Sequence, residues 1–412
     1  MRALLYQRSI PRYAWTKLVG GRTAKGVTGP GSSLSLTDVP EPRLPGPSWL
    51  RIKPTLAGIC GSDLAVLNTH ASLYPSAFTS FPFVPGHELV GIVSDVGTAV
   101  TTCHVGDRVV LEPALGCIVR GFREPCATCA RGRYANCERA TLGDISEGLQ
   151  TGYCRDTGGG WGAEVVAHES QVHAVAGGIS DAAAVLIEPL SCCVHAVAQA
   201  KVTDGARVLV IGCGSVGLMT IAALKHLRPS LTVVALARHA HQRELAEALG
   251  AEHVVSSGRE AYKDLAQLSG ACLHKLTIGK PAVVGGFDAT FDCVGSSSSI
   301  EDAVNWTRPQ GTAMLVGMPG PVKVDLAALW QKEIKLAGAY AYGDEIWQGR
   351  SVKTFDLAIE MMANGWADRL APLVTHSYPL AQYREAIATA LSVGRRKAVK
   401  TVFDLTKEME AS

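Results

Sequence analysis

The sequence has few charged residues, almost no net charge and no low-complexity tract. Charged side chains make up 18% of the 412 residues, and the formal net charge is +2. No stretch gathers basic residues into a stripe, which removes the electrostatic footprint expected of a dedicated nucleic-acid-binding protein. Hydrophobic residues reach 47%, so the chain has ample material for buried cores and is not a disordered protein. A chain of this length is expected to form two or three domains.

Signals for export or membrane insertion are also missing. Residues 1–20 lack the apolar run and the small-residue cleavage site of a secretory signal. The longest uncharged apolar run, Val208–Leu224, carries three glycines near its start, which suits a buried strand–turn–helix better than a membrane span. The 12 cysteines are too few for a disulfide scaffold, and four of them fall within Cys117–Cys137. Without an export signal this clustering favours metal binding, and we expect a cytoplasmic protein with no membrane partner.

The order of the expected elements indicates an α/β protein. Residues 34–175 contain β-branched segments broken by Gly, Pro and Asp, so this part should be rich in strands. From about residue 180 helices alternate with short buried strands, an order that gives a parallel, doubly wound sheet. From about residue 350 helix and strand patterns mix again. Gly20–Gly31 and roughly Ser256–Gly286 show no clear periodicity and are predicted to be surface insertions.

The segment VLVIGCGSVGLMTIAAL contains a dinucleotide-binding fingerprint. Gly212, Gly214 and Gly217 have the spacing G-x-G-x-x-G, directly after an expected strand and at the start of an expected helix. The three glycines allow a tight turn, the close approach of a pyrophosphate, and close packing of the helix on the strand. Glycines also fall at this spacing by chance, but the complete strand–turn–helix–strand context favours cofactor binding.

The end of the next strand predicts which cofactor is bound. Ala237 stands where an Asp or Glu would bind the ribose hydroxyls of NAD, and Arg238 follows it. A neutral residue followed by a basic one accommodates the 2′-phosphate of NADP. The alternative is that Arg238 is only a solvated residue at the start of a helix.

Three short segments carry residue types that bind metal ions. GICGSD presents Cys60 and Ser62, PGHE presents His87 and Glu88, and IEPLSCC presents Glu188. A thiolate, an imidazole and carboxylates suit a Zn²⁺ site that keeps one position open for a substrate. Each segment alone also has a structural explanation, as a buried thiol, a turn histidine or a carboxylate at a helix start. Their joint occurrence in this order favours a catalytic zinc site.

A second candidate zinc site lies in the segment GCIVRGFREPCATCARGRYANC. Cys117, Cys126, Cys129 and Cys137 can supply four thiolates, and the Cys-x-x-Cys step is a common spacing for zinc ligands. Such a site would stabilise a loop that has little else to hold it together. The alternative is four unrelated thiols within 21 residues.

These motifs together resemble the zinc-containing medium-chain dehydrogenase/reductase superfamily over nearly the whole chain. GICGSD, VPGHELVGIV, VGDRVV, the cysteine segment, the EPL step, GCGSVG and FDCVG stand in that family's order. The resemblance implies a β-rich, GroES-like catalytic domain and a Rossmann coenzyme domain, with the active site between them. It places the catalytic domain at residues 1–187 and 342–412, and the Rossmann domain at residues 188–341.

The resemblance also implies roles for single residues. Cys60 and His87 correspond to ligands of the catalytic zinc, and Glu88 to a ligand or an exchangeable one. Glu188 stands where polyol- and threonine-dehydrogenase-like members have a glutamate, and Ser62 matches the hydroxyl that takes the substrate proton. The implied cofactor contacts are Gly212, Gly214, Val216, Gly217 and Arg238.

The chain departs from the family pattern at three places. Arg123 occupies the position of the first structural-zinc cysteine, and Cys117 is the only nearby substitute. Ala65 stands where threonine, polyol and alcohol dehydrogenases often have a histidine, so the proton must leave by water or another group. The insertion within Ser256–Gly286 has no counterpart in the pattern.

The predicted activity is that of a zinc-dependent alcohol dehydrogenase or carbonyl reductase that prefers NADP(H) to NAD(H). Zinc would act as a Lewis acid on the substrate oxygen, and the nicotinamide would exchange the hydride. The expected partners are a small alcohol or carbonyl substrate and further copies of the chain in a dimer or tetramer.

Three other functions are weighed against this prediction. A catalytically silent NADP(H)-binding sensor and a zinc-free quinone or enone reductase are both disfavoured by the intact set of metal-ligating residues. A nucleic-acid-binding zinc module needs basic surroundings and stacking aromatics, and only two aromatic residues lie in the cysteine segment. The basic residues near that segment are Arg120, Arg123, Arg131, Arg133 and Arg139.

Overall fold

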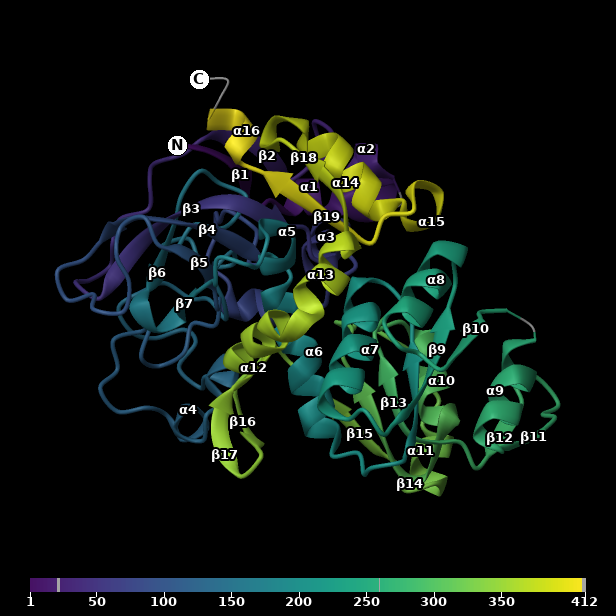
Figure 1. The fold of residues 1–412 in the computed structure, drawn as a ribbon. Coiled ribbons are helices and arrows are strands. Elements are labelled where there is room, and N and C mark those ends of the chain that lie inside the picture. Colours follow the sequence, from purple (N-terminus) through teal and green to yellow (C-terminus); the bar gives the residue numbers. More distant parts are fainter. Residues whose placement is uncertain (21–22, 259, 410–412) are drawn as a thin grey trace. The chain divides into compact units, whose positions relative to one another are not determined.

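The computed structural model describes residues 1–20, 23–258 and 260–409, and these form two compact units (Figure 1). Unit 1 consists of Met1–Glu188 together with the chain from Ala341 onward. Unit 2 is Pro189–Tyr340. The C-terminal segment therefore returns to the unit in which the chain begins.

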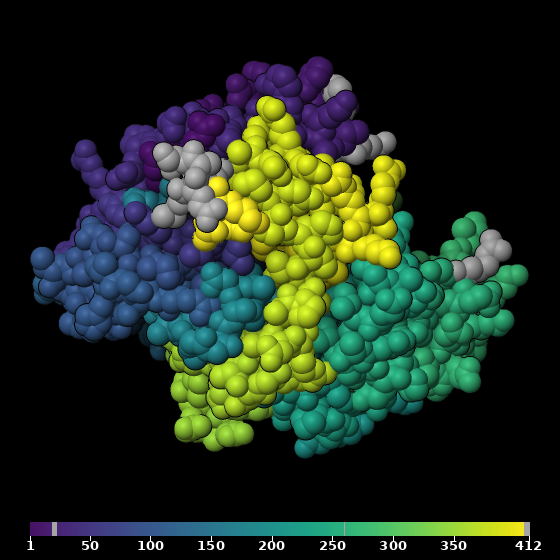
Figure 2. All heavy atoms as spheres, turned by 45° about the horizontal axis from the view of Figure 1, so that its top comes forward, coloured from purple at the N-terminus to yellow at the C-terminus, as the bar shows by residue number. Residues whose placement is uncertain are grey.

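Unit 1 is organised around a seven-stranded sheet that joins distant parts of the sequence. β3 (Trp49–Gly58) runs antiparallel to β4 (Leu89–Val96) on one side and to β19 (Lys400–Asp404) on the other. The order is β18–β19–β3–β4–β5–β7, and β6 also pairs with β3. The yellow C-terminal segment accordingly lies against the purple N-terminal segment in Figure 2. The other strands of this sheet are β5 (Arg108–Leu111), β6 (Val165–His168), β7 (Val172–Ala174) and β18 (Val374–Tyr378).

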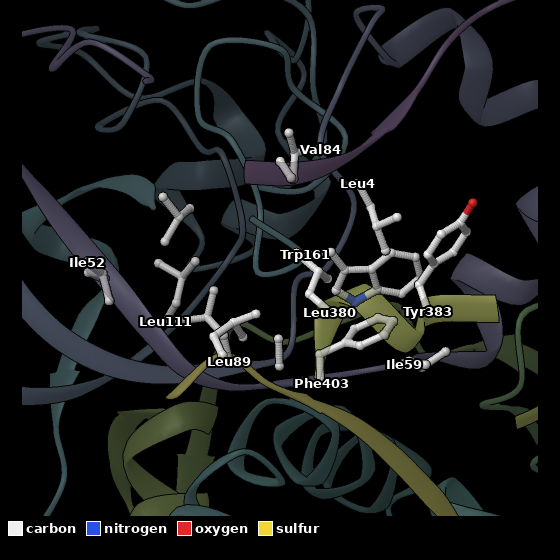
Figure 3. Packing of buried hydrophobic residues seen from close by; sticks show 14 of the residues in the cluster. Leu4, Ile52, Ile59, Val84, Leu89, Leu111, Trp161, Leu380, Tyr383 and Phe403 are labelled. Carbon is white, nitrogen blue, oxygen red and sulfur yellow. The ribbon is translucent and has the colours of Figure 1, made fainter. Parts of the chain in front are cut away.

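The core of unit 1 determines the backbone conformation beside His87. Trp161 is fully buried, its ring lies 5.3 Å from that of Phe403, and its indole N–H donates to the Gly58 carbonyl at 3.0 Å (Figure 3). Gly86 has a φ of +99°, and a Cβ there would lie 2.4 Å from the Trp161 ring. Glycine can adopt this positive φ without strain, and it has no Cβ to collide with the Trp161 ring. The packing of Trp161 therefore fixes the turn immediately before His87.

Unit 2 contains a six-stranded, parallel sheet in the order β10–β9–β8–β13–β14–β15. This is the strand order of a Rossmann dinucleotide-binding fold, which confirms the predicted doubly wound sheet. The strands are β8 (Arg207–Ile211), β9 (Thr232–Ala237), β10 (His253–Ser256), β13 (Phe287–Asp292), β14 (Thr307–Leu315) and β15 (Lys335–Gly338). The helices between them are α7 (Ser215–Leu227), α8 (Ala240–Ala248), α9 (Ala261–Ser269), α10 (Ser297–Trp306) and α11 (Ala327–Gln331).

The two segments expected to be irregular insertions contain regular structure in their described residues. Within Gly20–Gly31, whose residues 21–22 lie outside the described residues, α2 (Ala24–Thr28) forms. Ser256–Gly286, apart from residue 259, contains α9 and an antiparallel hairpin of β11 (Cys272–His274) and β12 (Ala282–Val284). The expectation of no periodicity was wrong for α9, because its buried side is only a narrow stripe of small and apolar residues.

No helix among the described residues is both long and apolar enough to cross a bilayer. The strands not yet named are β1 (Arg2–Tyr6), β2 (Leu34–Asp38), β16 (Asp344–Trp347) and β17 (Arg350–Lys353). The α-helices not yet named are α1 (Ile10–Trp15), α3 (Gly61–Leu67), α4 (Ala127–Ala130), α5 (Asp181–Ala184), α6 (Ile187–Ala200), α12 (Thr354–Met361), α13 (Ala367–Leu370), α14 (Tyr383–Leu391), α15 (Val393–Arg396) and α16 (Thr406–Met409). Short helical turns of other types are η1 (Thr16–Gly20), η2 (Tyr74–Phe78), η3 (Tyr134–Asn136), η4 (Glu169–Gln171), η5 (Met362–Trp366), η6 (Ala371–Leu373) and η7 (Leu380–Gln382).

Candidate active site

Three of the four predicted ligands of the catalytic zinc come together in unit 1. The sulfur of Cys60, a ring nitrogen of His87 and a carboxylate oxygen of Glu88 all lie within 4.8 Å of one another. Cys60 caps the start of α3, and the other two residues immediately precede β4. His87 and Glu88 are buried, whereas Cys60 is half-buried, so the group remains accessible from the thiol side.

Glu88 has a partner that the sequence analysis missed. The ammonium group of Lys400, on β19, lies 2.7 Å from both carboxylate oxygens of Glu88, and both side chains are almost fully buried. Burial alone would lower the pKa of Lys400, but the charge of Glu88 raises it. Gly58 leaves room for this pair, since a Cβ there would lie 1.9 Å from Glu88 Oε2. In this arrangement Glu88 balances a buried cation rather than pointing freely at a metal.

Glu188 lies close to this group without being part of the trio. It stands in the first turn of α6 and is almost fully buried. Burial raises the pKa of Glu188 to about 7, with His87 and Lys400 acting against the shift. A side-chain hydrogen bond from Tyr342 also favours its charged form. Its carboxylate is therefore within electrostatic reach of the candidate metal ligands.

The charges around this group favour a bound cation. Burial raises the pKa of Asp63, and burial alone would lower the pKa of His87, but neighbouring acidic groups raise it well above its usual value. A divalent cation would offset this excess of buried acidic groups, so the donor set fits Zn²⁺. The acidic groups are Cys60, Asp63, Glu88 and Glu188, against the basic groups His87 and Lys400.

Ser62 and Ala65 lie on α3, beside Cys60. Ser62 is half-buried in the first turn of the helix, two residues after the candidate ligand. Ala65 follows within the same helix and carries no group that could accept a proton. The structure thus keeps a hydroxyl beside the candidate ligand Cys60 and has no proton-accepting side chain at position 65.

The four cysteines of the second candidate site also gather in one place. The sulfur atoms of Cys117, Cys126, Cys129 and Cys137 all lie within 4.8 Å of one another, and Cys117 lies 3.6 Å from Cys137. Backbone N–H groups donate to three of the sulfurs, including a 3.2 Å contact to Cys117. Such donors favour thiolates, so the cluster fits a closed tetrahedral Zn²⁺ site. Cys117 thus supplies the fourth sulfur, which the family pattern would place at position 123, where this chain has Arg123. We call the segment Cys117–Cys137 the cysteine lobe.

Arg120 has a structural role that the sequence analysis did not identify. It is fully buried, and its guanidinium group donates to five main-chain carbonyls on both sides of the lobe. The nucleic-acid alternative counted Arg120 among the basic residues that flank the cysteine segment, but its guanidinium group is buried and cannot reach a nucleic acid. Arg133 pairs with Glu345 at 2.8 Å, which also removes it from any exposed basic surface. The carbonyls held by Arg120 belong to Leu115, Leu142, Ile145, Ser146 and Gly148.

Replacing Arg120 by methionine should destabilise the cysteine lobe. The change leaves several buried carbonyls without donors, and we expect the free energy of unfolding to fall by roughly 3–5 kcal/mol. Chemical denaturation and zinc analysis check this, with Arg131→Met, an exposed arginine of the same lobe, as control. Unchanged stability of Arg120→Met would show that these hydrogen bonds do not hold the lobe.

A buried ionic network anchors the lobe to the rest of unit 1. Tyr134, within the lobe, donates to the carboxylate of Glu112, which also contacts His173 at 3.0 Å and Lys353 at 3.1 Å. His173 contacts Asp356 at 3.3 Å through its other ring nitrogen. Burial alone would raise the pKa of Glu112, but His173 and Lys353 lower it. The network thus joins the lobe, two strands and the returning C-terminal segment.

This network predicts a pH dependence of stability. Burial alone would lower the pKa of His173, but its hydrogen bonds to Asp356 and Glu112 raise it above its usual 6.5. A raised folded-state pKa stabilises the protein below pH 6.5, and this contribution disappears as the pH rises through the raised value. The free energy of unfolding of His173→Gln should therefore fall less steeply above about pH 6.5 than that of the wild type. Denaturation at several pH values tests this, with the exposed His70→Gln as control; identical slopes in all three proteins would contradict it.

The glycine fingerprint in unit 2 has the geometry of a nucleotide-binding turn. Gly212 has a φ of +87°, and a Cβ at Gly217 would lie 1.8 Å from the Gly212 carbonyl oxygen. A Cβ at Gly214, by contrast, would meet no atom within 4 Å among the described residues. Packing therefore does not require glycine at position 214, and the open space fits a ligand that approaches the backbone closely. Val216 lies half-buried in the first turn of α7, where main-chain N–H groups point out of the helix.

Ala237 and Arg238 stand where the sequence analysis placed them, at the end of the second parallel strand. Ala237 is the last residue of β9 and is fully buried, and Arg238 is exposed directly after it. The rings of His239 and His241 stack at 5.7 Å on the following turn. This edge of the sheet therefore offers positive charge and no carboxylate at the position of Ala237.

Two parts of the chain match known domain families. Residues 46–177 match the alcohol dehydrogenase GroES-like domain, and residues 215–362 match the zinc-binding dehydrogenase family. Sorbitol dehydrogenase of Arabidopsis thaliana is 29% identical over 363 residues, covering 87% of this chain and 89% of the relative. Sorbitol dehydrogenase of Bos taurus is 30% identical over 366 residues, covering 88% and 91%. The structure of 2R,3R-butanediol dehydrogenase from Bacillus subtilis has a TM-score of 0.70 at 23% identity, covering 98% of this chain and 99% of that chain.

The two domain matches stand in the order of the motifs, and the relatives align over most of their own length. The chain therefore belongs to the zinc-containing medium-chain dehydrogenase/reductase superfamily, on its polyol dehydrogenase-like side, and is a zinc-dependent alcohol dehydrogenase that uses a nicotinamide cofactor.

Proposed function

We propose that this enzyme interconverts a small polyol or vicinal diol and the matching ketone, with zinc at Cys60, His87 and Glu188 and with NADP(H) as the preferred cofactor. The observation that carries the proposal is the cluster of the Cys60 thiol and the His87 imidazole with the neighbouring Glu88 and Glu188 carboxylates, which has a surplus of acidic groups. The names of the relatives, sorbitol dehydrogenase and butanediol dehydrogenase, support the substrate class.

The third protein ligand in this proposal is Glu188 rather than Glu88. Lys400 already holds both oxygens of Glu88 at 2.7 Å, and freeing one of them would leave a buried ammonium group poorly compensated. Glu188 is almost fully buried in the first turn of α6, and a neighbouring cation would lower its raised pKa. Three protein ligands leave the fourth position of a tetrahedral site open for the substrate.

Zinc bound at this site supplies a Lewis acid that polarises the substrate oxygen and lowers its pKa. The chain's own contribution to proton transfer is Ser62. Its hydroxyl, two residues from Cys60 and half-buried, takes up the proton of the substrate hydroxyl during oxidation while it releases its own proton to water, and the transfer runs in reverse during reduction. Lys400 contributes indirectly, because it compensates the charge of the Glu88 carboxylate beside the ligands.

The cofactor in this proposal lies over the glycine turn of unit 2. Gly212 and Gly217 shape the turn, Gly214 leaves room for the pyrophosphate, and Val216 offers its backbone in the first turn of α7. Arg238 would then pair with the 2′-phosphate of NADP through a planar, permanently charged group.

The cysteine lobe holds a second, structural zinc in this proposal. Its four thiolates leave no open position, and the hydrogen bonds of Arg120 show that the surrounding loop is fixed rather than adapted to a substrate.

We also propose a homo-oligomer that forms through unit 2. Strand β15 is an edge strand of the parallel sheet, so its free side can pair with another copy. Exposed apolar side chains precede and flank it in the sequence, and a partner would cover them. These side chains are Val322, Leu326, Trp330, Leu336 and Tyr340.

An activity screen tests the proposed function. Purified protein is assayed with NADP⁺ and NAD⁺ over polyols, vicinal diols, secondary alcohols, sugars and aryl alcohols. We expect the highest kcat/KM with a polyol or vicinal diol and NADP⁺. Activity confined to aryl alcohols would reject the substrate class, and bound zinc without turnover of any substrate would favour the silent sensor.

A further inference from the structure

Tyr153 contacts the candidate metal site without belonging to its ligands. Its hydroxyl donates to Asp63 Oδ1 at 2.9 Å. The other carboxylate oxygen, Asp63 Oδ2, accepts the backbone N–H of Cys60 at 3.1 Å. Oδ1 of the same carboxylate also lies 3.6 Å from Nδ1 of His87. One buried carboxylate therefore links the phenol to two of the candidate zinc ligands.

The Asp63 carboxylate is placed to accept a hydrogen bond from Nδ1 of His87. This nitrogen is buried and has no hydrogen-bond partner among the described residues, although Asp63 stands just beyond hydrogen-bond distance. A small rotation of the carboxylate or the ring would complete the bond. Metal-binding histidines normally donate their second N–H to such a carboxylate, which fixes the orientation of the ring.

The position of Tyr153 is itself well determined. Its ring centre lies 5.1 Å from that of Phe83 and 5.9 Å from that of His87. The ring packing and the hydrogen bond to Asp63 together hold the phenol in one orientation.

We propose that Tyr153 is a positioning residue for the catalytic zinc site. Its hydroxyl holds the Asp63 carboxylate between Cys60 and His87, and thereby fixes the direction in which the His87 imidazole presents its free nitrogen. This inference rests on the proposed assignment of Cys60 and His87 as zinc ligands.

The size of the effect follows from the distance of Tyr153 from the metal ligands. Removing the carboxylate that orients a metal-binding histidine weakens metal binding about 10- to 100-fold, and Tyr153 acts one step further out. A cavity of about 10 Å³ lies beside the phenol, lined by Tyr6, Asp63, Val66, Leu67, Phe83, Pro85, Tyr153 and Trp161. It is large enough for about one water, which could partly replace the lost hydroxyl. We therefore expect roughly a tenfold loss of zinc affinity.

The test is Tyr153→Phe, which removes the hydroxyl and keeps the ring packing. Zinc affinity is measured by chelator competition, and the thiolate-to-cobalt absorption of the Co²⁺-substituted protein is recorded against Cys60→Ala to isolate this site. We expect about tenfold weaker zinc binding and a shifted cobalt band, because the His87 imidazole loses the carboxylate orientation that the Tyr153 hydroxyl holds.

Tyr6→Phe is the matched control, because Tyr6 is a second tyrosine that lines the same cavity. It should leave zinc affinity and the cobalt band unchanged. In an Asp63→Asn background, Tyr153→Phe should cost little more in zinc affinity, since it acts through Asp63.

Wild-type zinc affinity and an unchanged cobalt band in Tyr153→Phe would overturn the inference while leaving the proposed function intact. If the wild-type protein bound no metal that depends on Cys60, the proposed function would fail first and the inference with it.

Discussion

Replacing Cys60 or His87 by alanine is expected to reduce kcat/KM roughly a thousandfold or more, while NADPH binding survives. Loss of a ligand removes the Lewis acid, which contributes several kcal/mol of transition-state stabilisation, and each 1.36 kcal/mol is a factor of ten in rate. The two ligands lie in unit 1, whereas the glycine turn lies in unit 2. Cofactor affinity should therefore stay near the wild-type value. Steady-state kinetics and NADPH fluorescence titration measure the two properties separately.

Two substitutions elsewhere in unit 1 control for general damage. Cys103→Ala removes a buried thiol outside both cysteine groups, and His70→Ala removes an exposed imidazole. Both should leave kcat/KM within about twofold of wild type, since neither residue belongs to a candidate metal cluster. Near-normal activity in both Cys60→Ala and His87→Ala would show that the reaction does not depend on this metal.

Exchanging the residues at the end of β9 is expected to invert the cofactor preference. Charge-assisted hydrogen bonds are worth about 1.5–3 kcal/mol, so the wild-type enzyme should prefer NADP⁺ by roughly ten- to a hundredfold in kcat/KM. Ala237→Asp adds a carboxylate that repels the 2′-phosphate and accepts bonds from the ribose hydroxyls of NAD⁺. Arg238→Ile removes the cation at the exposed position that follows. The double variant should then prefer NAD⁺, because it gains a repulsive element and loses an attractive one.

The control removes an exposed positive charge from another part of unit 2, by Lys275→Ile. Its ratio of NADP⁺ to NAD⁺ activity should equal that of the wild type. Because Ala237 is fully buried, the melting temperature of each variant is measured alongside the kinetics. A wild-type preference for NAD⁺, or an unchanged ratio in the stable double variant, would reject Arg238 as the phosphate-binding residue.

The parts of the structure that the sequence predicts well depend on local patterns. The expected helix after the glycine fingerprint is α7, Ser215–Leu227, and the strand before it is β8, because turn glycines and apolar runs define both within a few residues. The strand that ends at Ala237 is equally local. The cysteine lobe was predicted from spacing within 21 residues, and the structure brings its four sulfurs together.

The parts that the sequence could not reveal depend on contacts between distant residues. Lys400 reaches Glu88 across 312 positions of the chain, and Tyr153 reaches Asp63 across 90. A buried lysine near the end of a chain and a tyrosine in a loop carry no local pattern that distinguishes them from surface residues. Arg120 is similar, because a basic residue beside a cysteine segment resembles an exposed one until its carbonyl partners are known.

The most direct test of the account is to restore zinc to metal-depleted enzyme and to follow reduction of NADP⁺ by the best polyol or diol. Zinc content and the absorbance of the reduced nicotinamide are measured in the same samples, for the wild type and for Cys60→Ala. The account predicts that wild-type activity returns in proportion to one zinc per chain beyond the zinc of the cysteine lobe, and that Cys60→Ala binds one zinc fewer and stays inactive. Full activity in the wild-type protein while it lacks the Cys60-dependent zinc would contradict it.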